Sequence, residues 1–514
     1  MVLLIHRSAS ELVKVKRGDK IIETSSNINV VFWELAQKYP EEIIGWCEES
    51  LEDELNVEVW PSIFHHDRII ASYAFKTIFL PRAIGYVDQL PFINVPRDVK
   101  YPSWLMSSDV GGIKGKTLLQ FKSLFSKIKD FGYLLNAIAK LGQQNSLFCY
   151  SDPALIKLDE KIKELKCIAS TTQLFSFVYQ HYNSFWTSIL FWCFIYYEKK
   201  IPIFSYLLAF FNKKRFKSEI DLSEVHSYSV LNLEEGVNLD IIIPTIGRSQ
   251  YLLKVLEDLS IQTLLPERVI IIEQNPEKES ISELSFLYDK KWPFEIVHQF
   301  IHKTGACSAR NIALNEVKAK WIFFADDDIR LNYDLLETAF IEINKYNISA
   351  LNMNCKQEEQ KTVFHKIKQW GAFGSGTAIV SSEFALQCRF SEIYEYGFGE
   401  DTDFGLQLRA KGADVIYHPD VQITHLKAER GGFRGMPEMP WEESGLTPKP
   451  SPTMMVLVKS HFNLWMQRGY KVSLFLKFYN KQPIKNPVVY LKSMKKRWKL
   501  SEYWASEKLK QIYK

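Results

Sequence analysis

The chain has 514 residues, of which 46% are hydrophobic and 24% charged, and its formal net charge is +4. This length and composition are typical of a globular protein with two or three domains, and they argue against a disordered chain. The seven cysteines are widely scattered and form no CxxC pair, which argues against a cysteine zinc site and a redox motif.

The N-terminal region, residues 1–235, begins with the apolar stretch MVLLI, but charged residues follow at once. The apolar core of about 7 to 15 residues that a signal peptide needs is therefore missing, and we expect a cytoplasmic protein. Helix-like and strand-like runs predict an α/β or mostly helical domain without a phosphate loop. Two roles remain open for it: an acceptor-binding or assembly domain, or a degenerate α/β partner of a catalytic domain.

An apolar segment lies near the end of this region, at residues 184–217. Its longest uncharged run, Ser184 to Tyr197, is shorter than the roughly 20 residues that a membrane-spanning helix needs. Glu198 and Pro202 then interrupt the pattern. The segment predicts either two buried helices or a membrane-surface hairpin with basic flanks.

From residue 237 the pattern changes to apolar strands that alternate with helices. A β-branched run, Ile241 to Ile243, ends at Pro244, and a second run, Val269 to Ile272, follows leucines at helical spacing. The pattern recurs with a helix near residues 309–317 and a strand at residues 321–324. Such βαβ units predict a parallel sheet that binds ligands at the carboxyl ends of its strands.

Three consecutive aspartates, Asp326, Asp327 and Asp328, follow the last of these strands directly. Adjacent carboxylates repel one another, so we expect a positive charge beside them. A divalent cation that prefers oxygen ligands, Mn²⁺ or Mg²⁺, would provide it. Taken alone, the run is more typical of an acidic turn or a helix N-cap on the surface.

Four motifs occur together in this part of the chain: IIIPTIGR, ARNIAL, FFADDDI and GFGEDTDFGLQLRAKG. With them, residues 238–430 resemble the family-2 glycosyltransferases of the GT-A fold. The resemblance implies an α/β, Rossmann-like nucleotide-diphospho-sugar transferase domain at residues 236–450. It also implies an inverting glycosyltransferase that moves a sugar from a nucleotide sugar, of the uridine type, to a glycan or lipid-linked acceptor. The alternative is a noncatalytic scaffold that binds sugar nucleotides or glycans.

The resemblance also implies a donor site. Its predicted members are Pro244, Thr245, Arg248, Glu273, Gln274, Arg310, Asp326 and Asp327. Many family members end the second strand with two aspartates, whereas this chain has Glu273 and Gln274 there. An amide can still donate to and accept from the edge of a uracil ring.

The metal and the catalytic base follow from the same resemblance. Asp328, Asp326 and His425 are the expected ligands of Mn²⁺ or Mg²⁺, which would stabilise the diphosphate leaving group. Asp401 is the expected base for the acceptor hydroxyl, with Glu400 and Asp403 as competing choices. The alternative is that Glu400 and Asp401 only favour a helix N-terminus.

Two further segments belong to this prediction. The Gly-rich stretch after His425, with Lys427, Arg430 and Arg434, has the composition of a mobile loop that closes over the diphosphate. Trp370, in WGAFGSGTAIV, offers either an aromatic plane for a saccharide or an ordinary core position.

The C-terminal region, residues 451–514, has 14 Lys and Arg residues against two Glu, a local net charge of +12. Because the whole chain carries +4, the first 450 residues carry −8. The region predicts a basic helical tail that contacts the inner face of the plasma membrane, where Phe475, Phe478, Trp498 and Trp504 would insert. The alternative is a solvated basic bundle, and a nucleic-acid partner is not expected.

Overall fold

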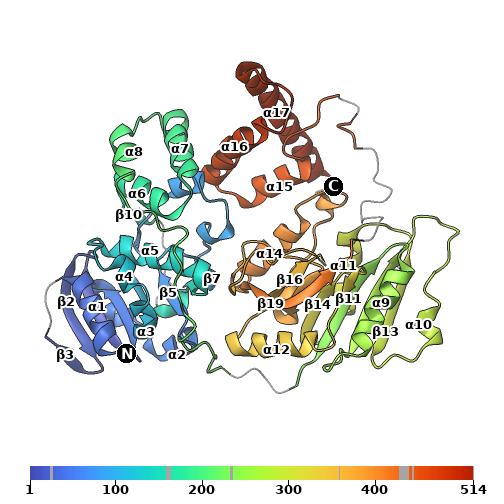
Figure 1. Ribbon diagram of the computed structural model, residues 1–514, viewed down its shortest axis with the longest axis horizontal. Coiled ribbons are helices and arrows are strands. Elements are labelled where there is room, and N and C mark those ends of the chain that lie inside the picture. Colours follow the sequence, from blue (N-terminus) through green and yellow to red (C-terminus); the bar gives the residue numbers. More distant parts are fainter. Residues whose placement is uncertain are drawn as a thin grey trace. The chain divides into compact units, whose positions relative to one another are not determined.

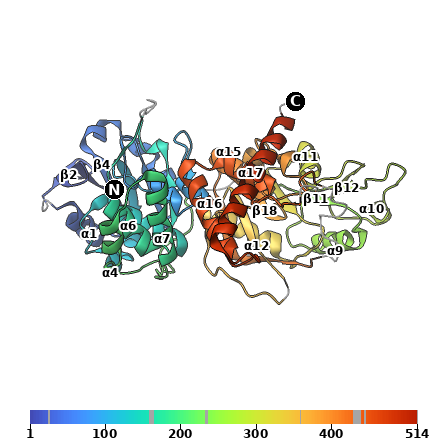
Figure 2. The ribbon, with the colours of Figure 1, turned by 90° about the horizontal axis from the view of Figure 1, so that it is seen from above.

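The computed structural model describes residues 1–23, 27–157, 164–231, 236–357, 359–427, 439–442 and 445–512. The chain forms two compact units. The first unit comprises Met1–Leu231 and Phe462–Lys477, and the second comprises Asn232–His461 and Phe478–Lys514. Figures 1 and 2 show their elements from two directions. The C-terminal region that we predicted as one tail therefore contributes helices to both units.

The first unit is an α/β domain with a mixed sheet in the order β3-β2-β1-β4-β8-β5-β9-β7. The strands of this sheet are β1 (Val2–Arg7), β2 (Glu11–Arg17), β3 (Lys20–Ile22), β4 (Ile43–Glu48), β5 (Ile69–Tyr73), β7 (Tyr101–Pro102), β8 (Val110–Lys114) and β9 (Phe148–Ser151). A separate pair is formed by β6 (Thr77–Ile78) and β10 (Lys166–Cys167).

Helices surround this sheet, and one of them is buried along its whole length. They are α1 (Ile28–Lys38), α2 (Trp60–Ile63), α3 (Gly115–Leu119), α4 (Lys122–Phe125), α5 (Phe131–Gly142), α6 (Thr171–His181), α7 (Ser184–Cys193), α8 (Ile203–Ala209) and α16 (Leu464–Tyr479). Every residue of α5 is buried, and α6, α7 and α8 stand together as a helical group in Figure 1. A π-helical turn, Phe194–Glu198, follows α7.

The second unit contains the predicted βαβ units in a sheet of order β13-β12-β11-β14-β18-β16-β19-β15, with β17 paired to β19. Its strands are β11 (Leu239–Thr245), β12 (Arg268–Gln274), β13 (Glu295–Ile301), β14 (Trp321–Ala325), β15 (Ile329–Arg330), β16 (Ala350–Lys356), β17 (Lys368–Gln369), β18 (Thr377–Ser381) and β19 (Val415–His425). Its helices are α9 (Ser249–Ser260), α10 (Phe286–Asp289), α11 (Ala306–Glu316), α12 (Leu335–Tyr346), α13 (Ser382–Ala385), α14 (Glu400–Ala410), α15 (Pro452–His461) and α17 (Pro487–Ile512).

The register of the second sheet sets the position of the predicted site. Strand β11 is parallel to both β12 and β14, so the carboxyl ends of all three strands meet at one edge. Strands β11, β12 and β14 are almost completely buried, as expected for a sheet that helices cover on both faces. The aspartates that follow β14 therefore emerge at the edge where such sheets bind ligands.

The two units share one central topology. In the first, β1 is parallel to β4, β4 and β5 are both antiparallel to β8, β5 is parallel to β9, and β9 is antiparallel to β7. In the second, β11, β14, β18, β16, β19 and β17 pair in the same order and with the same directions. The chain visits the corresponding strands in the same sequence in both units.

The C-terminal helices use their aromatic side chains for packing. Trp498 is only 4% exposed, and Phe475, Phe478 and Trp504 are half-buried. The Phe478 ring also lies beneath the cations of Lys449 and Arg497, at 4.7 and 5.2 Å from the ring centre. The predicted membrane insertion of Trp498 is therefore wrong, and none of the other three side chains is fully exposed.

Candidate active site

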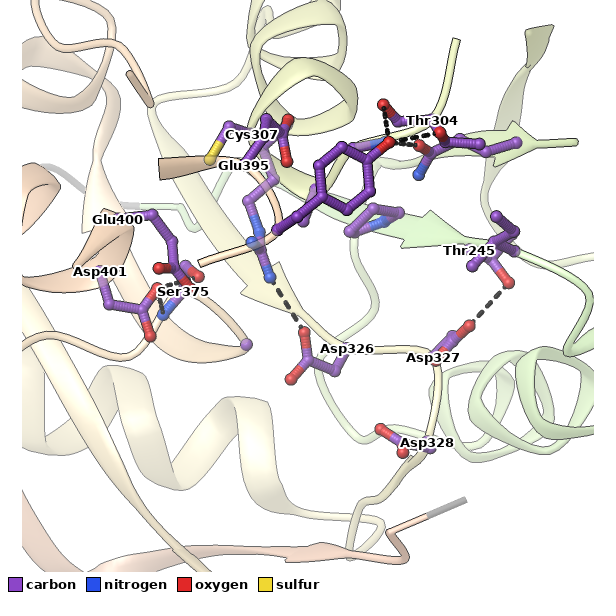
Figure 3. A pocket seen from close by; sticks show the side chains of 18 of the residues that line it. Thr245, Thr304, Cys307, Asp326, Asp327, Asp328, Ser375, Glu395, Glu400 and Asp401 are labelled. Carbon is purple, nitrogen blue, oxygen red and sulfur yellow. Dashed lines mark hydrogen bonds and ion pairs between the residues drawn. The ribbon is translucent and has the colours of Figure 1, made fainter. Parts of the chain in front are cut away.

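A cavity of about 520 Å³ lies at the carboxyl edge of the second sheet. All the predicted site residues except Glu273 line it: Pro244, Thr245, Arg248, Gln274, Arg310, Asp326, Asp327, Asp328, Glu400, Asp401 and His425. They come from the ends of β11, β12, β14 and β19, from the N-cap of α9, from α11 and from the first turn of α14. Figure 3 shows the three consecutive aspartates along one wall and Asp401 with Glu400 across from them.

Two arginines pair with the three aspartates. Arg310 Nη2 lies 3.1 Å from Asp326 Oδ1, and Arg248 Nη1 lies 2.6 Å from Asp327 Oδ1. The same Arg248 atom lies 3.2 Å from Asp328 Oδ2. These two guanidinium groups offset part of the repulsion among the carboxylates.

Asp327 also bonds to the end of β11. Its second oxygen accepts a hydrogen bond of 2.7 Å from the Thr245 hydroxyl, at the end of β11. Burial raises the pKa of Asp327 to about 6, against the lowering effect of Arg248. Asp327 therefore links the loop after β14 to the end of β11.

Asp326, Asp328 and His425 form a group that could hold a metal ion. One ligand atom from each lies within 4.8 Å of the others, and His425 Nε2 is 3.2 Å from Asp328 Oδ1. The hydrogen bond with Asp328 raises the pKa of His425. Two carboxylates and one imidazole are a donor set that suits Mn²⁺ or Mg²⁺, and open positions would remain for oxygen atoms of a substrate.

A glycine opposite Asp326 gives its carboxylate room. A Cβ atom at Gly376, which comes directly before β18, would collide with the Asp326 carboxylate. The pairing of Ala325 with Thr377 across β14 and β18 brings these two positions together. Sequence reasoning did not identify this contact, because it depends on a pairing between strands that are distant in the chain.

Asp401 lies in the first turn of α14 and accepts hydrogen bonds from the hydroxyl and the backbone N–H of Ser375. Burial raises the pKa of Asp401, while Arg310 and Ser375 lower it. Burial and the charge of Asp401 also raise the pKa of Glu400. A buried carboxylate with a raised pKa is a better proton acceptor than an exposed one.

Asp403, the other competing base, does not line the cavity. It accepts hydrogen bonds from His461 of α15, at 2.6 Å, from Gln407, at 2.7 Å, and from the Tyr394 hydroxyl, at 3.4 Å. Asp403 therefore links α14 to α15 and to the segment that precedes α14.

The two residues at the end of β12 have separate environments. Gln274 lines the cavity, and its Oε1 accepts a hydrogen bond of 2.6 Å from the Gly305 N–H. The Glu273 carboxylate instead accepts from the Ser282 hydroxyl and the Glu283 N–H and lies 3.0 Å from His298 Nε2. Neighbouring side chains of a strand point to opposite faces, so Glu273 does not line the cavity that Gln274 lines.

Two residues that sequence reasoning missed close the cavity beside Gln274. The Glu395 carboxylate accepts a hydrogen bond of 2.8 Å from the Ser308 N–H and packs against Gly305, where a Cβ atom would collide with it. The Tyr396 hydroxyl donates to the Thr304 carbonyl at 3.1 Å. Tyr396 has a positive φ of 57°. Their position just before GFGED is a signal that could have identified them.

The two further predicted segments have different outcomes. Lys427 lines the cavity, whereas Arg430 and Arg434 lie outside the described residues. Trp370 does not line the cavity; its ring stacks on Tyr417 with the ring centres 4.9 Å apart. Its environment is therefore that of an aromatic packing cluster.

Solved structures that are similar to this chain share little sequence identity with it. A search of curated proteins finds no match. Among solved structures, S. aureus TarS 1-349 in complex with UDP-GlcNAc is similar at 14% identity and a TM-score of 0.38, covering 51% of this chain and 80% of that one. GalNAc-T7 with UDP, GalNAc and Mn²⁺ is similar at 13% identity and a TM-score of 0.37, covering 53% and 59%. These structural similarities are too weak to carry a functional assignment.

The family comparison covers the strands that build the cavity. The model of Glycosyl transferase family 2 matches residues 240–385, from β11 to α13. This match confirms the predicted family and the GT-A type of fold for this part of the chain. The second unit therefore carries a glycosyl transferase family 2 domain, and the protein is a glycosyltransferase.

Proposed function

We propose that the protein transfers a sugar, with inversion, from a UDP-type nucleotide sugar to a hydroxyl group of a glycan or lipid-linked acceptor. The observation that carries the proposal is the convergence of two groups in one cavity. Asp326, Asp328 and His425 converge within 4.8 Å of one another, and Asp401 lines the same cavity. A noncatalytic scaffold would have no use for a buried carboxylate opposite a metal-binding group.

The donor is held at the edge formed by β11, β12 and β14. Arg248 and Arg310 supply positive charge toward the diphosphate, and the free amide N–H group of Gln274 faces the base. Mn²⁺ or Mg²⁺ bound by Asp326, Asp328 and His425 would neutralise charge on the leaving diphosphate. Arg248 and Arg310, which pair with the aspartates in this structure, would share their charge with the donor phosphates.

The acceptor is activated from the other wall of the cavity. Asp401 accepts the proton of the attacking hydroxyl as the new bond forms, and Ser375 orients its carboxylate. Glu400, one residue earlier, contributes negative charge that favours the same proton transfer. Tyr396 and Glu395 close the donor end and limit access of water.

The acceptor and the location follow from the same proposal. A lipid-linked bacterial surface polysaccharide, built on the inner face of the plasma membrane, suits a cytoplasmic enzyme whose residues 451–514 carry a local net charge of +12. None of the helices that the structure describes is both long and apolar enough to cross a bilayer. Contact with the membrane would then be peripheral.

Metal-dependent release of UDP tests the proposal. The full-length protein is incubated with a panel of sugar nucleotides, with Mn²⁺, with Mg²⁺ and with a chelator. We expect one donor to be cleaved only when a divalent cation is present, and Asp401→Asn to reduce transfer to acceptor while donor binding persists. Failure to cleave or bind any sugar nucleotide would contradict the proposal and favour the scaffold.

A further inference from the structure

The segment 184–211, which we call the apolar hairpin, consists of α7, the π-helical turn and α8. One face of it is packed: Ile189, Leu190 and Cys193 of α7 and Ala209 of α8 are buried. Ser205 of α8 also shares a hydrogen bond of 2.9 Å with Thr172 of α6. The hairpin is therefore held firmly on the helical group of the first unit.

The opposite face of the apolar hairpin is apolar and exposed. Phe204 and Phe211 are 83% and 87% exposed, more than any other aromatic side chain in the described ranges. Trp192, Ile203, Leu207 and Phe210 are exposed beside them. Several large apolar side chains exposed on one short segment indicate an interaction site, since soluble proteins rarely leave a large apolar patch open.

The charges next to this face are almost all positive. Residues 184–217 contain six Lys and Arg and one carboxylate, Glu198. That carboxylate already accepts a hydrogen bond of 2.5 Å from the Tyr86 hydroxyl. Lys199, Lys200 and Lys213 are exposed at the two ends of α8. The surface therefore presents apolar side chains with a basic border.

We propose that the apolar hairpin docks onto an anionic lipid bilayer, with α8 lying in the interface and its aromatic residues among the head groups. Amphipathic helices with a basic border and large apolar residues bind such surfaces, and Trp and Tyr favour the interfacial region. With seven residues, α8 reaches only about 10 Å along its axis, so it cannot cross the bilayer. This proposal names the surface for the peripheral contact suggested above, but it does not depend on transferase activity.

Charge favours lipid over a second copy of the chain. Two hairpins placed face to face would bring two strongly positive borders together, which costs Coulomb energy. An anionic leaflet instead attracts each nearby lysine. Dimer formation is therefore an alternative outcome that the experiment must detect.

Vesicle flotation of the full-length protein, without donor or acceptor, tests the docking surface. The vesicles contain phosphatidylcholine with phosphatidylglycerol, or phosphatidylcholine alone. Phe204→Ser with Phe211→Ser should lower binding to the anionic vesicles about tenfold or more, because each phenyl ring no longer leaves water. Both positions are too exposed for the change to unfold the protein. Ile281→Ser, at an 82% exposed position of the second unit, is the matched control and should bind as the parent does.

Charge variants separate the hairpin from the C-terminal region. The first charge variant combines Lys199→Gln, Lys200→Gln and Lys213→Gln. It should bind anionic vesicles more weakly than the parent, and its binding should depend less on salt concentration. Lys495→Glu, Lys496→Glu and Lys499→Glu, all exposed on α17, should have the smaller effect. The proposal is overturned if only the α17 variant loses binding, or if the phenylalanine variant binds like the parent. It is also overturned if the parent protein is a dimer and the phenylalanine variant is a monomer that binds vesicles as the parent does.

A different observation carries a second inference: the geometry points to the first unit as a diverged copy of the transferase fold whose donor site is closed. In the first unit Cys47, the second-last residue of β4, pairs with Val110 of β8. In the second unit Ala325, the last residue of β14, pairs with Thr377 of β18 in the same way. The residues that follow these two positions, Glu48 and Glu49 in the first unit and Asp326 and Asp327 in the second, are therefore equivalent.

Three differences close the equivalent edge. Strand β1 turns directly into antiparallel β2, so the loop and helix that follow β11 have no counterpart there. Arg7 occupies the position of Thr245, and its Nη2 lies 2.7 Å from a carboxylate oxygen of Glu49. This ion pair takes the place of the hydrogen bond between Thr245 and Asp327. Asp109 replaces Gly376, and its carboxylate accepts hydrogen bonds from the N–H groups of residues 75–77.

Titration calorimetry with UDP and Mn²⁺ tests this inference, which rests on the proposed function. We expect one equivalent of UDP per chain and a much weaker affinity for it in Asp328→Asn. Two equivalents, or a binding event whose affinity Asp328→Asn leaves unchanged, would overturn the inference. No binding by the parent would instead count against the proposed function of the second unit.

Discussion

His425 Nε2 lies 3.2 Å from Asp328 Oδ1 because β15 and β19 are antiparallel, with Ile329 opposite His425. The pairing carries the last residue of β19 back to the aspartates that follow β14. A histidine at the end of a strand and an acidic motif almost a hundred residues earlier thus become neighbours. Asp326, on the same loop, completes the group.

The first prediction concerns the metal. Asp328→Asn should lower transferase activity by at least about 100-fold, since even residues behind metal ligands contribute about 10- to 100-fold. Excess Mn²⁺ should restore part of it, because an amide oxygen still coordinates weakly. Activity is measured by UDP release across a Mn²⁺ titration. Asp289→Asn, at an exposed position of α10, is the control, and equal turnover in the two variants would contradict the ligand assignment.

The second prediction concerns the base. Asp401→Asn should reduce sugar transfer by about 10²-fold or more, the scale for loss of a general base, with donor affinity almost unchanged. Glu400→Gln, one residue earlier in α14, should have the smaller effect. Donor affinity by calorimetry and turnover by UDP release distinguish the two roles. If Glu400→Gln is the crippled variant, the two roles are reversed.

The third prediction concerns pH. Asp401 must be ionised to accept a proton, so transfer should fall as the pH drops through its pKa, which burial raises. The hydrogen bond from Ser375 lowers that pKa, so Ser375→Ala should raise it and move the acid limb of the rate profile to higher pH. The profile of kcat/KM against pH measures the shift. An acid limb that stays in place in Ser375→Ala would argue against Asp401 as the titrating group.

The fourth prediction concerns Gly376. A methyl group at this position meets the Asp326 carboxylate, which is the mobile end of a side chain and can turn aside. Gly376→Ala should therefore raise the KM for donor and the Mn²⁺ requirement while the melting temperature changes little. Thermal unfolding and donor titration check both parts. A variant with normal donor affinity would show that Asp326 keeps its position by other means.

The sequence alone was enough to locate the catalytic domain and most of its cavity. Continuous β-branched runs such as Ile241 to Ile243 favour buried strands of a covered sheet, and parallel strands bring their carboxyl ends to one edge. For this reason Thr245, Gln274 and Asp326 could be expected together. Local patterns were sufficient because each residue lies at a strand end that the pattern itself marks.

The tertiary structure was needed to decide which of two neighbouring candidate residues lines the cavity. Glu273 and Gln274 are adjacent and chemically similar, yet only the fold shows which of them faces the cavity. Asp403 does not line the cavity, and it is bonded to His461 from a helix far along the chain. Gly376 and Glu395 act through contacts between distant strands and loops, which no local pattern encodes.

The N-terminal region shows the same limit on a larger scale. Its residues revealed neither the shared topology with the second unit nor which face of residues 184–211 is exposed. Topology depends on which distant strands pair, and exposure depends on what packs against each face. The sequence by itself placed Phe204 in an apolar segment and Trp498 in a basic helical region. Only tertiary packing decided that Trp498 is buried and Phe204 faces the solvent.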